Sequence, residues 1–176
     1  NDIYLNDLSA INWITGTPKA GYEIRKWTPH VFNGILDGNG HMIYGLYVDT
    51  DPVSYTQGYS NAARGAGLVS MDRGSDWGWV SFKNLGMDKV YVDSANCSAA
   101  FVGTVSNKDN TKIYFESCYL GSDVTLKGYS VGGFLGGGGT GNVKHGVKVR
   151  NSVSLVTRMT AACGKTGAFY GDVWGN

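Results

Sequence analysis

The chain has 176 residues, carries 15 Lys and Arg against 14 Asp and Glu, and contains 27 Gly but only 3 Pro. This length favours one domain with a single core. The nearly balanced charge argues against nucleic-acid or anionic-membrane partners, because it provides no strong positive field. No apolar stretch approaches the roughly 20 residues that cross a bilayer, so the sequence predicts no membrane insertion.

Residues 1–30 are expected to form an amino-terminal cap, in which Trp13 and Trp27 shield the end of the following structure. After this segment, residues 31–46 contain two strand-like runs on either side of Asp37-Gly38-Asn39-Gly40. Glycine allows positive φ, and Asx side chains accept hydrogen bonds from turn amides. The pattern therefore predicts a tight corner between two short strands.

A short apolar pattern then returns four times. Its members are Gly67-Leu68-Val69-Ser70, Ala100-Phe101-Val102-Gly103, Gly133-Phe134-Leu135-Gly136 and Ala168-Phe169-Tyr170-Gly171. The central residues Leu68, Phe101, Phe134 and Phe169 follow one another at spacings of 33, 33 and 35 residues. A second pattern, which starts at Phe82, Phe115 and Val149, keeps the same step. Such a fixed period is the signature of a repeat architecture.

A period near 33 residues also fits ankyrin or tetratricopeptide arrays, which need two amphipathic helices per repeat. The apolar segments of these repeats are instead short, β-branched or aromatic, and interrupted by glycine. They predict an all-β fold, a right-handed parallel β-helix with three strands per coil. Residues 1–176 would form one domain, with residues 1–30 as the cap and residues 31–176 as about four coils, the last one incomplete. Stacking would place Leu68, Phe101, Phe134 and Phe169 in an internal ladder. In the same register Lys83, Glu116 and Arg150 would share one outward position.

The sequence Phe-Asn-Gly-Ile-Leu-Asp-Gly-Asn-Gly-His-Met-Ile-Tyr-Gly-Leu at residues 32–46 closely resembles the opening coil of the GLUG-motif β-helix family. The lead-in around Ile3–Asp7 and Trp27–Pro29 and the later Gly-Phe-Leu-Gly repeats are also similar to that family, so the resemblance covers nearly the whole chain. It implies a secreted or cell-surface bacterial protein, since such repeats occur in adhesin-like proteins and in non-catalytic parts of bacterial IgA peptidases. It also implies that His41 is a packing residue of the corner, with flanking modules as partners.

The best candidate binding site is the segment Asp76-Trp77-Gly78-Trp79 with three residues nearby, Tyr55, Tyr59 and Arg73. Exposed indoles offer flat apolar faces to sugar rings or to a protein partner. The favoured interpretation is nevertheless structural, with Trp77 and Trp79 folded over the coil as a buried lid, because Trp is usually well buried.

No cofactor is predicted. Asp49 and Asp51 together with Asp93 suggest calcium only weakly, since calcium takes six to eight oxygen ligands. The sequence also lacks a nucleophile elbow and a zinc-protease helix. β-Helices do host polysaccharide lyases and hydrolases, so catalysis stays open as an alternative. The sequence favours a non-catalytic interaction, adhesion or spacer module, with a carbohydrate-binding module or a polysaccharide-active fragment as the alternatives.

Overall fold

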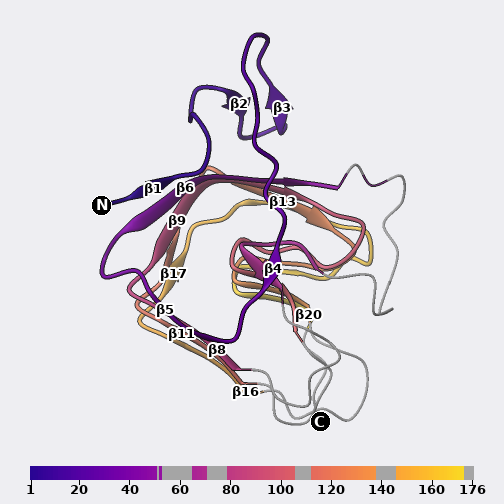
Figure 1. Ribbon diagram of the computed structural model, residues 1–176. Coiled ribbons are helices and arrows are strands. Elements are labelled where there is room, and N and C mark those ends of the chain that lie inside the picture. The colour runs from indigo at the N-terminus through magenta and orange to yellow at the C-terminus, as the bar shows by residue number, and fades with distance from the viewer. Residues whose placement is uncertain (51, 53–64, 71–78, 106–111, 138–145, 173–176) are drawn as a thin grey trace.

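The chain folds into short β-strands joined by turns. The computed structural model describes residues 1–50, 52, 65–70, 79–105, 112–137 and 146–172, and these ranges contain no helix (Figure 1). Over the same ranges there is accordingly no helix long and apolar enough to cross a membrane. The predicted all-β class is confirmed, and strands with equivalent places in the repeat pair in parallel.

Three parallel sheets contain most of the strands. The five-stranded sheet has the strands β4 (His30–Val31), β7 (Val69–Ser70), β10 (Val102–Thr104), β15 (Leu135–Gly137) and β20 (Tyr170–Asp172). The four-stranded sheet has β5 (Gly34–Asp37), β8 (Trp79–Lys83), β11 (Lys112–Glu116) and β16 (Gly146–Arg150). The seven-stranded sheet has β1 (Ile3–Tyr4), β6 (Met42–Asp49), β9 (Gly86–Asp93), β12 (Tyr119–Leu120), β13 (Val124–Gly128), β17 (Val153–Ser154) and β18 (Arg158–Ala161).

Two smaller pairs complete the described strands. β14 (Val131–Gly132) and β19 (Thr166–Gly167) are parallel, and β2 (Ile11–Asn12) and β3 (Thr17–Pro18) form an antiparallel hairpin. From β4 onward, the chain contributes strands to the five-stranded, the four-stranded and the seven-stranded sheet in that order, and it then repeats this order. Figure 1 shows equivalent strands of successive repeats lying one behind another.

The core lies between the sheets and is built from stacked phenylalanines. Phe101 and Phe134 are fully buried, and their ring centroids lie 4.8 Å apart. Phe169 is half-buried and packs edge-to-face on Phe134 at 5.2 Å, while Leu68 lies at the other end of the series with 6% of its surface exposed. Aromatic pairs of this kind contribute about 0.5–1.5 kcal/mol beyond their burial. The residues Phe101, Phe134 and Phe169, which recur at the repeat spacing, thus form a continuous row of rings in edge-to-face contact.

The lead-in packs differently from the predicted cap. Trp27 does lie against the core, where its Nε1 donates to the carbonyl oxygen of Leu68 at 2.9 Å. Trp13 instead packs with the β2–β3 hairpin on the outer face of the seven-stranded sheet, over the stacked rings of Tyr47 and Tyr91. The expectation that Trp13 covers the end of the stack is therefore wrong, because two outward tyrosines provide an apolar surface on the sheet itself.

The predicted corner at Asp37-Gly38-Asn39-Gly40 connects β5 to β6. Asn39 and Gly40 have φ values of 50° and 80°, in the left-handed region that Gly and Asn tolerate best. The Asp37 carboxylate accepts the Asn39 amide at 2.9 Å and the side-chain amide of Asn84 at 3.1 Å. These hydrogen bonds lower the pKa of Asp37. His41 lies beside the amino terminus, with Nδ1 3.5 Å from the carboxylate of Asp2.

Candidate functional site

The four-stranded sheet presents one face to the core and the other to solvent. Because strand side chains alternate, Val80 and Phe82 of β8 point inward while Trp79, Ser81 and Lys83 point outward. The same alternation in β11 turns Tyr114 and Glu116 outward, and in β16 it turns Lys148 and Arg150 outward. The exact parallel register then places these outward residues in rows across the strands.

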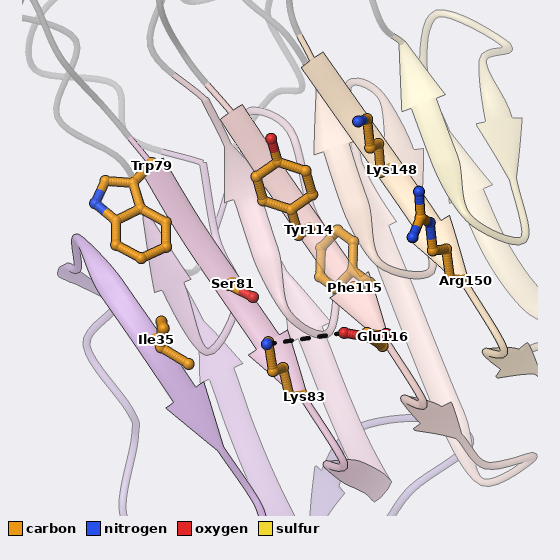
Figure 2. A pocket seen from close by; sticks show the side chains of 9 residues that line it. All are labelled: Ile35, Trp79, Ser81, Lys83, Tyr114, Phe115, Glu116, Lys148 and Arg150. Carbon is orange, nitrogen blue, oxygen red and sulfur yellow. Dashed lines mark ion pairs between the residues drawn. The ribbon is translucent and has the colours of Figure 1, made fainter.

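The outer face is hollowed into a groove of about 320 Å³ (Figure 2). Residues from all four strands line it, and they are Ile35, Trp79, Ser81, Lys83, Tyr114, Phe115, Glu116, Lys148 and Arg150. Figure 2 shows the rings of Trp79 and Tyr114 on neighbouring strands, with Ser81 between Ile35 and Tyr114. The groove crosses the strands rather than following one of them.

Trp79 does not belong to a buried lid. It is the first residue of β8, and 45% of its surface is exposed at the groove. Lys112 is its partner in the register, so Tyr114 lies diagonally across from Trp79 on the next strand. Diagonal neighbours in a sheet stay within reach of aromatic side chains. The two rings therefore offer adjacent apolar surfaces to one ligand.

Ser81 is a polar residue buried in the groove wall. Only 2% of its surface is exposed, and within the described structure its Oγ has no hydrogen-bond partner. Its register neighbours are Ile35 on one side and Tyr114 on the other. A buried hydroxyl without a partner costs about 1–3 kcal/mol. The Ser81 Oγ is thus an unpaired hydrogen-bonding group in the wall of the groove.

Charged residues form the end of the groove near the corner. Lys83, Glu116 and Arg150 share one row, which confirms the register predicted from their spacing. The Nζ of Lys83 lies 3.8 Å from the Glu116 carboxylate, and both side chains are partly exposed. Lys148 lies with its Nζ 5.6 Å from the centroid of the Tyr114 ring. The described lining thus has three cations and one carboxylate.

Of the candidate residues named from the sequence, Trp79 is the one that the described structure places in this groove. The others, Trp77, Tyr55, Tyr59 and Arg73, lie outside the described residues. Sequence reasoning missed Ser81, Tyr114 and Lys148, and it used Arg150 only to mark the register. The sequence did contain a signal for Tyr114. Side chains alternate between the two faces along residues 112–116, and this alternation turns Tyr114 outward between two buried residues.

The aspartates considered for calcium are engaged with lysines. Asp49 pairs with Lys26 at 3.5 Å, and Asp93 pairs with Lys127 at 3.5 Å. Asp51 lies outside the described residues. Within the described ranges, no three His, Cys, Asp or Glu side chains gather where they could hold a metal ion.

The groove combines two aromatic faces, a buried hydroxyl and an excess of positive charge. Such a surface suits a ligand with flat apolar faces and several polar groups, because a few placed polar groups fix the orientation of a molecule held by apolar contact. Comparisons of the chain with family models, with curated proteins and with solved structures found no match.

Proposed function

We propose that the chain is a right-handed parallel β-helix of the GLUG type, and that it acts as a non-catalytic binding module of a secreted or cell-surface bacterial protein. The repeated order of the sheets and the parallel pairing of equivalent strands support this architecture. Parallel crossovers are right-handed in nearly all known cases. The resemblance of residues 32–46 to the GLUG motif supports the location and the presence of flanking modules as partners.

The groove on the four-stranded sheet is the proposed binding surface, and a glycan chain is the proposed ligand. The observation that carries this proposal is the pair of aromatic rings, Trp79 and Tyr114, beside the unpartnered hydroxyl of Ser81. A sugar ring packs its apolar face on an aromatic ring and directs its hydroxyls to the sides. One such hydroxyl would supply the hydrogen bond that Ser81 lacks.

The composition of the groove favours binding over hydrolysis. Glycosidases need two carboxyl groups on either side of the scissile bond, one acting as acid and the other as base or nucleophile. Among the groove residues that the structure describes, Glu116 is the one carboxylate, and it is paired with Lys83. A surface with aromatic platforms and one paired carboxylate is suited to holding a polysaccharide without cleaving it.

Affinity electrophoresis in gels that contain soluble polysaccharides tests this proposal. We expect the wild type to be retarded by at least one glycan, and Trp79→Ala to bind about tenfold more weakly through loss of stacking. Tyr119→Ala is the matched control, because Tyr119 is an aromatic residue with 38% exposure on the other large sheet. Unchanged binding by Trp79→Ala, or no retardation of the wild type by any glycan, would overturn the proposal.

A further inference from the structure

We infer that the ligand of this groove is an acidic glycan, whose carboxylate groups are bound by Lys148 and Arg150 of β16. This inference rests on the proposed glycan-binding function and names the class of glycan. It starts from the charge of the groove, where Lys83, Lys148 and Arg150 face a single carboxylate on Glu116. A neutral polymer would leave this positive charge without a partner, whereas a carboxylated one would complement it.

Lys148 and Arg150 lie two residues apart on the same face of one strand, and both are exposed. Side chains two residues apart on a strand are separated by about 6.6 Å. The two cations therefore repel each other, and an anion between them would offset this repulsion. Figure 2 shows both side chains on the groove side of β16. Within the described chain neither of them has an ion pair, so their charge is available to a ligand.

Each cation is suited to a carboxylate for a different reason. Lys148 lies over the Tyr114 ring, at 5.6 Å from its centroid, which holds the ammonium group beside the surface on which a sugar would stack. Arg150 provides a planar guanidinium that can form two parallel hydrogen bonds to one carboxylate. A sugar on Tyr114 would therefore have its carboxylate next to both cations.

Glu116 limits the binding of anions at the other side of the groove. It lies between Lys83 and Arg150 in the register, and its pairing with Lys83 neutralises that lysine. Removing the Glu116 charge would release Lys83 from this ion pair and would remove a carboxylate that repels a ligand anion bound at Arg150. The geometry thus predicts a gain of affinity for acidic glycans in Glu116→Gln, which a purely structural role of the ion pair would not produce.

The experiment measures binding of polygalacturonate, alginate and hyaluronan, each against its carboxyl-reduced, neutral counterpart. We expect the wild type to prefer at least one acidic polymer by about tenfold or more, and the Lys148→Gln, Arg150→Gln double variant to lose this preference while still binding the neutral form. Glu116→Gln should bind the acidic polymer at least about threefold more tightly. Lys112→Gln is the matched control, because Lys112 is an exposed lysine of the same sheet that does not line the groove.

The outcomes separate the two proposals. Equal binding of acidic and neutral forms would overturn the acidic-glycan inference and leave the glycan-binding function standing. Dextran sulfate, which carries sulfates and no carboxylates, is measured alongside, and a preference for it over every carboxylated polymer would also overturn the inference, because the assigned ligand group is a carboxylate. An equal loss in Lys112→Gln would show that net charge, and not the pair on β16, attracts the polymer. Absence of binding to all forms would overturn both proposals.

Discussion

Replacing Ser81 by alanine should stabilise the protein. The Ser81 hydroxyl is buried without a partner, so the folded state carries a desolvation cost of about 1–3 kcal/mol that alanine does not have. Loss of the oxygen removes a few contacts worth about 0.1–0.2 kcal/mol each. We expect a net gain near 1 kcal/mol in the free energy of unfolding, which corresponds to about 2–4 °C in Tm for a chain of this size.

Ser130 provides the matched control for this measurement. It is equally buried, with 1% of its surface exposed, but its Oγ donates to the Gly136 carbonyl oxygen at 2.8 Å. Ser130→Ala should therefore lower the free energy of unfolding by about 1 kcal/mol. Urea titrations followed by circular dichroism compare both variants with the wild type. The reasoning is refuted if Ser81→Ala loses as much stability as Ser130→Ala.

Three further changes test the packing and the charges. Gly136→Ala should lower the free energy of unfolding by about 1–3 kcal/mol, because a Cβ there would lie 2.5 Å from a backbone oxygen. Gly146→Ala, where the nearest atom to a Cβ is 3.7 Å away, should change it by no more than about 0.5 kcal/mol. Thermal melts of the two variants test this difference. Phe101→Ala should lower the free energy of unfolding, measured in urea, by about 3–5 kcal/mol. A loss under about 1 kcal/mol would contradict the packing of Phe101 among the core rings. Hydrogen bonding to Lys89 lowers the pKa of Asp123 in the folded protein. The Asp123 carboxylate therefore stabilises the fold above its ordinary pKa of 3.8, and this stabilisation is lost as the pH falls through the lowered pKa. Asp123→Asn should be less stable than the wild type at about pH 7, and the two should converge in urea titrations at strongly acidic pH.

The strand class could be predicted from the short, β-branched and glycine-rich segments, and the register from the spacing of the repeat. Equivalent residues in parallel strands follow one another at the period of the repeat, so Lys83, Glu116 and Arg150 could be aligned without coordinates. The burial of Phe101 and Phe134 follows the same rule, since an apolar residue that returns at one period faces one interior.

The groove itself could not be predicted from the sequence. Alternation shows that Tyr114 points outward, but the depth of the groove depends on how the side chains of Ile35, Ser81 and Lys148 on other strands are arranged around it. The packing of Trp13 was missed for a related reason. Its segment does not repeat, so no periodicity tells on which face of a sheet it lies.

Each strand of the four-stranded sheet contributes its own side chains to the groove, and neighbouring strands lie about 4.8 Å apart. The reach of the binding surface is therefore set by the number of repeats, so that one additional repeat would lengthen it by one strand spacing. A substitution such as Lys148→Ser would alter a single contact point and leave the backbone of the neighbouring strands in place. Length and selectivity of the surface can thus change independently, the first through duplication of a repeat and the second through single outward residues.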